Sequence, residues 1–174
     1  MHLQINFSYN DYFRVPGIQI GIDDIVLFNG PVCLHVEFEP KLVKGTHTFW
    51  ITHHSKQPHE TTNEHDTHVF IKNILFDGVD IDQLEYQKLS HRGKFYPEYN
   101  TDYVKDCIMN NIELPEYFSP NHYLGHNGIW KLDFEAPAMN WIIKEQNPSG
   151  INLEDTMFST GKNTIQEIKD LFNL

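Results

Sequence analysis

The sequence has few basic residues and no long apolar run. Its 13 lysines and arginines stand against 24 aspartates and glutamates, which gives a formal net charge of −11. Proteins that bind nucleic acids need clustered lysine and arginine to contact the phosphate backbone, so this composition argues against that class. The longest apolar stretches are far shorter than the span of a bilayer, which argues against a membrane protein.

Cysteine is scarce as well. Cys33 and Cys107 are the only two, and they lie far apart in the chain. We expect them to be buried free thiols rather than part of a disulfide framework. The N-terminal segment MHLQINFSYN lacks the basic start, the apolar core and the small-residue cleavage site of a signal peptide. We therefore expect a protein that folds in a cytoplasm and is not secreted through such a peptide.

Motifs of nucleophilic and phosphate chemistry are missing too. The sequence has no G-x-S-x-G, and neither cysteine lies in a recognisable catalytic context. The segment 125–128 is a turn with no helix expected after it, so it does not predict a phosphate-binding loop. Asp133 and Glu135 are candidate glycosidase carboxylates, but they alternate with apolar residues as on the solvent face of an ordinary strand. We assign no catalytic residue and expect a protein that is not an enzyme.

What the sequence does contain is a series of short alternating segments. Apolar and polar residues alternate from His2 to Tyr9, and the same pattern recurs in VCLHVEFEP, THTFWITHH, THVFIKNILF and HNGIWKLDFEAP. Asn29-Gly30-Pro31 predicts a turn before Val32. Short strands without repeated helices between them favour an all-β fold, an antiparallel β-sandwich of the jelly-roll type, built as a single domain over 1–174.

The second half of the chain is less regular. Residues 92–123 are rich in tyrosine, asparagine and proline, and they predict long loops with one short element around Tyr103–Met109. The segment MNWIIK predicts either a strand or a single helical turn. A C-terminal helix is expected over about 163–173, with Asn163 as N-cap and an apolar stripe made of Ile165, Ile168, Leu171 and Phe172.

Six of the eleven histidines fall between His47 and His68, mixed with acidic residues. Imidazole and carboxylate are the groups that bind divalent metals and exchange protons near neutral pH. Strand alternation places His47 and His53 on one face of the segment 46–54. The connecting segment 55–65 is too long for a tight turn, and long loops at the end of a sandwich often carry binding residues.

Several roles for this histidine-rich hairpin stay open. Calcium would take Glu64, Asp66 and backbone carbonyls, and His68 projects from the same side as these two if the returning strand begins there. Zinc, the less favoured cofactor, would need several of His53, His54, His59, His65 and His68 with a carboxylate, and their spacing matches no standard zinc motif. A pH switch needs no metal, and a solvated hairpin without a specific role is the remaining alternative.

Aromatic residues supply candidate ligand contacts. Flat rings beside hydroxyl and amide groups suit both sugar stacking and protein interfaces, and they can also simply fill the rim of a small sandwich. The predicted ligand-binding residues are Trp50, His54, Tyr96 and Tyr99.

The segment from VCLHVEF to FDGVDI resembles the calcium-dependent carbohydrate-binding modules. The residues that carry the likeness are Gly45-Thr46-His47-Thr48 at the start of a strand and the apolar strand ending in Phe76-Asp77-Gly78. The resemblance implies a jelly roll whose loop carboxylates hold a calcium ion that contacts sugar hydroxyls, with Asp66 and Glu64 as its ligands. His53-His54 stand where that family has an Asn-Asp pair.

The whole chain, including GIWKLDFEAP and Trp141, also resembles small proteins of tailed bacteriophages, particularly those of marine cyanobacterial phages. This likeness of size and strand pattern implies a structural or accessory virion protein, made in the host cytoplasm. Such a protein acts by assembly with other virion proteins or as a homo-oligomer. The alternatives are a divalent-metal-dependent carbohydrate-binding module that recognises a surface glycan, and a zinc-dependent hydrolase.

Overall fold

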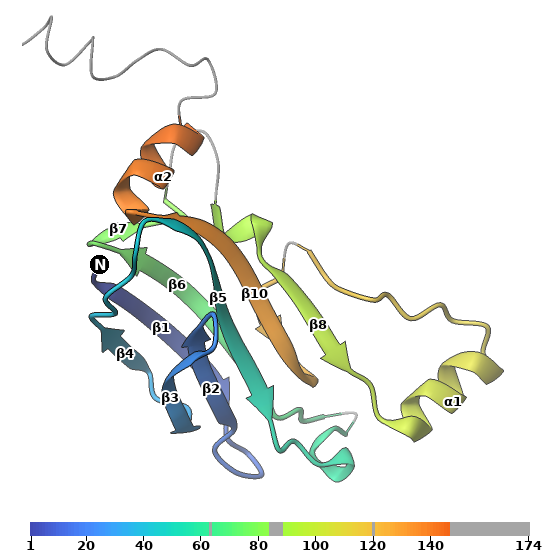
Figure 1. Cartoon of the computed structure of the whole chain (residues 1–174). Helices are drawn as coiled ribbons and strands as arrows, with labels where there is room; N and C mark the ends of the chain where they lie inside the picture. Colours follow the sequence, from blue (N-terminus) through green and yellow to red (C-terminus); the bar gives the residue numbers. More distant parts are fainter. Residues whose placement is uncertain (63, 84–88, 120, 147–174) are drawn as a thin grey trace, which may run out of the picture.

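The computed structural model describes residues 1–62, 64–83, 89–119 and 121–146, and it is a sandwich of two antiparallel sheets (Figure 1). The first sheet has the order β4-β1-β6-β7, with β9 paired to β6. Its strands are β1 (Leu3–Asn10), β4 (His35–Phe38), β6 (His68–Phe76), β7 (Val79–Asp80) and β9 (Tyr123–Leu124).

The second sheet has the order β3-β2-β5-β10-β8. Its strands are β2 (Gly17–Ile22), β3 (Ile25–Pro31), β5 (Gly45–His54), β8 (Lys94–Glu98) and β10 (Asn127–Ala136). Between described strands the chain changes sheet at every connection except the hairpins β2–β3 and β6–β7. This repeated crossing is typical of jelly-roll sandwiches, and it confirms the all-β sandwich predicted from the sequence.

The core lies between the two sheets and follows the predicted alternation. Leu3, Ile5 and Phe7 of β1 are buried, as are the inward residues of β10. Aromatic rings fill the centre: the ring centroids of Phe49 and Trp130 are 5.9 Å apart. Burying each large apolar side chain contributes about 1.5–3 kcal/mol, so these faces supply most of the stabilisation.

Three local predictions on the N-terminal half are wrong. Asn29-Gly30-Pro31 is the last part of β3 rather than a turn, and proline is tolerated there because β3 is an edge strand. Leu34 is 65% exposed and Cys33 is exposed, whereas Cys107 is buried as expected. Both exposed residues precede β4, which begins only at His35, so the strand pattern does not extend to them.

The segments predicted as loops contain more structure than expected. Short 3-10 helices occur at Pro58–Glu60 (η1) and Leu89–Arg92 (η2), and α1 covers Thr101–Met109. Asn100 caps α1 by accepting a hydrogen bond from the Tyr103 backbone N–H at 2.8 Å. MNWIIK belongs to a helix, α2 (Ala138–Gln146), whose Trp141 is buried at one end of the core. The helix expected over 163–173 lies outside the described residues.

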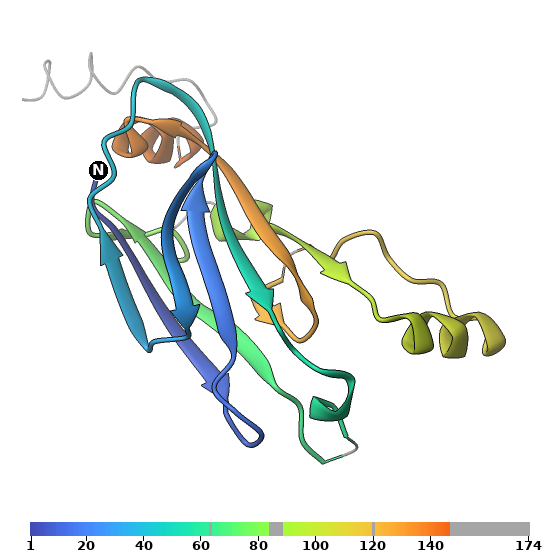
Figure 2. The same ribbon diagram turned by 60° about the horizontal axis from the view of Figure 1, so that its bottom comes forward.

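Residues 99–116, here called the arm, carry α1 and project away from the sandwich (Figures 1 and 2). Ile108, Met109 and Ile112 on the arm are 72%, 74% and 56% exposed. After the arm the chain returns to β8, where Phe118 exchanges two backbone hydrogen bonds with Phe95. None of the described helices is long and apolar enough to cross a membrane.

Candidate functional site

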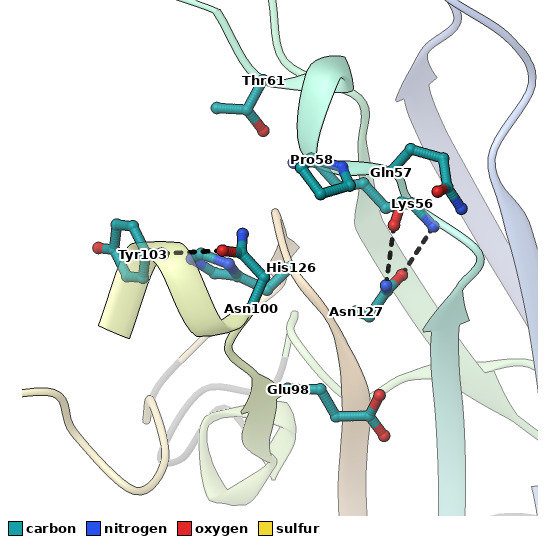
Figure 3. A pocket seen from close by; sticks show the side chains of 9 residues that line it. All are labelled: Lys56, Gln57, Pro58, Thr61, Glu98, Asn100, Tyr103, His126 and Asn127. Atoms are coloured by element: carbon teal, nitrogen blue, oxygen red, sulfur yellow. Dashed lines mark hydrogen bonds between the residues drawn. The ribbon is translucent and has the colours of Figure 1, made fainter. Parts of the chain in front are cut away.

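A pocket of about 120 Å³ lies at the end of the sandwich where β5 and β8 finish and β10 begins (Figure 3). Ligand pockets that enclose a whole small molecule have volumes of about 300–1,000 Å³. This pocket therefore suits one part of a larger ligand, such as a single ring of a polymer. We call it the strand-end pocket, and it is lined by Lys56, Gln57, Pro58, Thr61, Glu98, Asn100, Tyr103, His126 and Asn127.

Asn127 joins the segment after β5 to the start of β10. Its amide oxygen accepts a hydrogen bond from the Lys56 backbone N–H at 2.8 Å, and its Nδ2 donates to the Lys56 carbonyl at 3.0 Å (Figure 3). One side chain thus pairs with both backbone groups of Lys56, as a neighbouring strand would. This pairing fixes the backbone that forms one wall of the pocket.

The Lys56 side chain holds a second connection, here called the Lys56–Asp66 latch. Lys56 Nζ lies 2.5 Å from Asp66 Oδ1 and also donates to the Gly125 carbonyl. Asp66 accepts further hydrogen bonds from Thr61 Oγ1 at 2.7 Å and from the Tyr123 hydroxyl at 2.5 Å. Burial opposes ionisation of Asp66, but these donors outweigh it and lower its pKa. Burial and the Asp66 charge together raise the pKa of Tyr123.

The predicted metal ligands Glu64, Asp66 and His68 do not form a set. β6 begins only at His68, so the strand alternation that would align the three does not reach Glu64, which is exposed. His68 Nδ1 donates to the Asp66 carbonyl at 3.0 Å, and a cation at the Asp66 carboxylate would have to displace the Lys56 ammonium. As placed, these residues do not fit calcium, which needs several free oxygen ligands.

The five histidines considered for zinc are also dispersed. His53 is buried in the core, and His54 lies on the opposite face of β5. His59 is exposed in η1, and the His65 ring stacks on Tyr12 with centroids 3.6 Å apart. Over the described ranges, no three histidine, cysteine, aspartate or glutamate side chains are grouped so that they could hold a metal ion.

His53 instead holds the turn before β10 in place. It is 1% exposed, and its Nδ1 donates to the His126 carbonyl at 3.0 Å, while its Nε2 is buried without a partner among the described residues. Burial lowers the pKa of His53 to about 4, so the ring is neutral at pH 7. The buried neutral ring therefore supports the backbone that brings the His126 side chain into the pocket.

The aromatic residues that line the pocket are His126 and Tyr103, and Tyr99 contacts both from outside the lining. The His126 ring centroid lies 5.3 Å from that of Tyr99 and 5.4 Å from that of Tyr103. Burial lowers the pKa of His126, so this ring too is neutral near pH 7. Tyr99 is one of the predicted ligand residues. Its hydroxyl donates a hydrogen bond to the Pro115 carbonyl at 2.9 Å, which joins the two ends of the arm.

Glu98 and Asn100 leave polar groups unused in the described structure. Glu98 is exposed, and its carboxylate has no hydrogen bond or ion pair with any described residue. The Asn100 oxygen caps α1, while its Nδ2 donates to no described acceptor. A free carboxylate, a free amide donor and exposed ring surface together offer hydrogen bonds and stacking to a ligand that carries hydroxyl groups.

The other predicted ligand residues lie on the outer face of the second sheet. The Trp50 indole covers Gly21, where a Cβ would lie 2.2 Å from Cζ2 of Trp50, and its Nε1 donates to the Asp23 carbonyl at 2.8 Å. His54 lies over Gly17 in the same way. Tyr96 lies on this face of β8 beside the ring of Tyr117, with centroids 5.7 Å apart. The structure thus brings Trp50, His54 and Tyr96 to one face, next to the strand-end pocket.

Sequence reasoning missed the pocket residues Glu98, Asn100 and His126. One usable signal was present: Asn100 before TDYV has the form of a helix N-cap, which predicts a helix start and thereby the turn of the chain after Glu98. The pairing of Asn127 with Lys56 joins residues 71 positions apart, and nothing in a single sequence marks it.

No family model matches the sequence, and no curated protein is significantly similar to it. Among solved structures, the chain is similar to one described as "vCBM60 in complex with galactobiose", with a TM-score of 0.47 and 7% sequence identity. The match covers 76% of this chain and 97% of that one.

Proposed function

We propose that the protein is a non-catalytic saccharide-binding domain whose ligand enters the strand-end pocket and extends over the outer face of the second sheet. The observation that carries this proposal is the lining of the pocket: Glu98 and Asn100 offer free polar groups in a pocket that is also lined by Tyr103, which is 41% exposed. A sugar ring presents hydroxyl groups at its edge and C–H groups on its faces. The pocket supplies partners for both.

Glu98 and Asn100 offer complementary hydrogen bonds to a sugar. The Glu98 carboxylate accepts from sugar hydroxyls, and the Asn100 amide donates to a hydroxyl or ring oxygen. Hydrogen bonds that involve a charged group contribute about 1.5–3 kcal/mol, so Glu98 is the residue whose removal should weaken binding most. The Tyr103 ring provides the flat surface on which an apolar sugar face packs, and the His126 ring, tilted by 48° from it, contacts the edge of the same sugar.

The composition of the pocket favours binding over hydrolysis. Glycosidases place a pair of carboxyl groups on either side of the bond that breaks. Glu98 is the one carboxylate among the described residues that line the strand-end pocket, and the nearby Asp66 is held by Lys56 and Tyr123. A ligand in the pocket therefore meets one carboxylate and no second carboxyl group to complete an acid–base pair.

A glycan array followed by calorimetry tests the proposal. Glu98→Ala and Tyr103→Ala should each lower the affinity for the best glycan about tenfold or more, which corresponds to the loss of one charged hydrogen bond or one stacking contact. Glu113→Ala is the matched control, because Glu113 is an exposed carboxylate on the arm that lies outside the pocket. An array without any bound glycan, or equal affinity for all four proteins, contradicts the proposal.

We propose assembly as a second candidate function, favoured by the exposed apolar residues of the arm, with another copy of the chain as the partner. Ile108 and Met109 would pack on the partner's arm, while the arm's carboxylates repel each other. Salt screens that repulsion, so light scattering should show a mass that rises above one chain as salt is added. Ile108→Ser with Met109→Ser should stay monomeric, and a wild type that is monomeric at every salt concentration contradicts self-assembly.

A further inference from the structure

Two lysines face each other on the outer face of the second sheet. Lys94 of β8 and Lys131 of β10 are directly opposite in the register, and both are exposed. Directly opposed like charges destabilise a sheet. The protein has 24 acidic residues, and Lys56, Lys105 and Lys144 each pair with one of them. In the described ranges, neither Lys94 nor Lys131 has a carboxylate partner.

Aromatic rings hold the two ammonium groups on this face. Lys94 Nζ lies 4.5 Å from the centroid of Tyr117, and Lys131 Nζ lies 5.7 Å from that of Tyr96. Such cation–π contacts orient a lysine without neutralising its charge. On the other side, Lys131 is directly opposite Trp50 of β5. The face therefore presents two unneutralised cations between aromatic side chains.

The spacing suits an extended ligand. Neighbouring strands lie about 4.8 Å apart, so the row from Trp50 through Lys131 to Lys94 covers roughly 10 Å. Along β8, Lys94 precedes Glu98 by four residues, which is roughly 13 Å at the rise of a strand. A short oligosaccharide can thus contact the lysine pair at one end and the strand-end pocket at the other.

We propose that Lys94 and Lys131 form an anion subsite, and that the ligand is a saccharide bearing carboxylate or sulfate groups. The inference rests on the saccharide-binding function proposed above and names its ligand class. Opposite charges fix the direction of binding: the anionic group lies on the lysine pair, while Glu98 repels it from the pocket and accepts hydroxyl groups there. Tyr96, which lies between Lys94 and Glu98 along β8, stacks on the intervening sugar.

A nucleic acid is a weaker match to the same lysines. Its phosphates repeat along the whole strand and need a basic stripe, whereas Glu98 lies near one end of this face and the chain carries a net charge of −11. A saccharide with widely spaced anionic groups avoids that repulsion. A DNA oligonucleotide therefore belongs in the test as a competitor class.

The test measures binding of oligogalacturonate, dextran sulfate, neutral dextran and a single-stranded DNA oligonucleotide to the full chain. The double variant Lys94→Ala, Lys131→Ala should bind the preferred anionic saccharide about tenfold more weakly or worse, because it loses charged contacts. Added salt should lower the affinity of wild type for the same saccharide. Lys72→Ala with Lys41→Ala removes two charges from exposed lysines elsewhere and should change nothing. The melting temperature of the Lys94→Ala, Lys131→Ala variant should equal or exceed that of wild type, because the substitutions are on the surface and remove two opposed like charges.

Several outcomes overturn the inference: equal affinity of the two double variants, equal binding of neutral dextran and the charged polymers, or preferential binding of the oligonucleotide. They are distinguishable from failure of the proposed function. If Glu98→Ala lowers the affinity for a neutral glycan while the lysine double variant binds every saccharide as wild type does, saccharide binding stands and the anion subsite is wrong. If no saccharide binds at all, both are wrong.

Discussion

His47 and His53 lie on the same buried face of β5, near its two ends, yet their pKa values shift in opposite directions. His47 has two acceptors: Nδ1 lies 2.7 Å from Asp23 Oδ2 and Nε2 lies 2.9 Å from the Val43 carbonyl. The Asp23 contact therefore raises its pKa. His53 has one carbonyl acceptor and no nearby carboxylate partner among the described residues, so burial lowers its pKa to about 4.

The two histidines show that a strand fixes the face on which a side chain lies, while the adjacent loops supply the partners that set its pKa. At the His47 end, residues before β3 and β5 supply acceptors and leave the ring fully paired. At the His53 end, the backbone of His126 takes one ring nitrogen, and the adjacent pocket keeps Glu98 and Asn100 free for a ligand. At the first end the ring is fully paired by its own loops, and the second end carries the proposed binding pocket.

The largest expected effect concerns the pH dependence at the His53 end. The unfolded state binds a proton below about pH 6.5, whereas folded His53 stays neutral down to about pH 4, so this group reduces stability as the pH falls between these values. Urea unfolding should show wild type losing about 3 kcal/mol more than His53→Asn between pH 7 and pH 4. Parallel profiles for the two proteins would show that His53 is not desolvated.

The Lys56–Asp66 latch should give the next largest effect. Lys56→Met leaves Asp66 without its cation and should lower the free energy of unfolding by about 2 kcal/mol, less than for a fully buried pair, since Lys56 is 9% exposed but Asp66 is 26% exposed. Adding Asp66→Asn should restore part of the loss. Lys105→Met, which breaks the exposed pair with Asp102, is the matched control and should cost about 0.5 kcal/mol or less. Equal losses for the two lysines would contradict a buried latch.

The pH dependence of stability due to His47 should be smaller and of opposite sign. Because Asp23 raises the pKa of His47, its stabilisation is fully present below about pH 6.5 and disappears as the pH rises through the folded value. His47→Gln should therefore cost about 1 kcal/mol at pH 5.5 and less at pH 8.5. Thermal unfolding at both pH values measures this, and a loss that grows with pH would reverse the sign assigned here.

The smallest expected effect concerns added metals at the Asp66 carboxylate. Asp66 is occupied by donors, so adding calcium or zinc to chelator-treated protein should shift the melting temperature by less than about 1 °C. Asp66→Asn separates a specific site from a general ionic effect, because only a specific metal response depends on that carboxylate. A clear shift in wild type that disappears in Asp66→Asn would restore the metal hypothesis.

Much of the fold could be predicted because alternation along a strand is a local property. The inward residues of β1, β5 and β10 follow from parity, and so does the separation of His53 from His54. Parity would have aligned Glu64, Asp66 and His68 only if the returning strand already began at Glu64, but β6 begins at His68, so Glu64 and Asp66 are outside it. The pocket was missed because it is assembled from three separated segments, and one of its main contacts joins Asn127 to Lys56.

We propose that the strand-end pocket binds a saccharide through Glu98. The calorimetric affinity of wild type, Glu98→Ala and Glu113→Ala for the best glycan from an array decides this. Glu98→Ala should bind about tenfold more weakly or worse, while Glu113→Ala should match wild type. Equal affinity of the two variants, or no glycan bound by wild type, would contradict it.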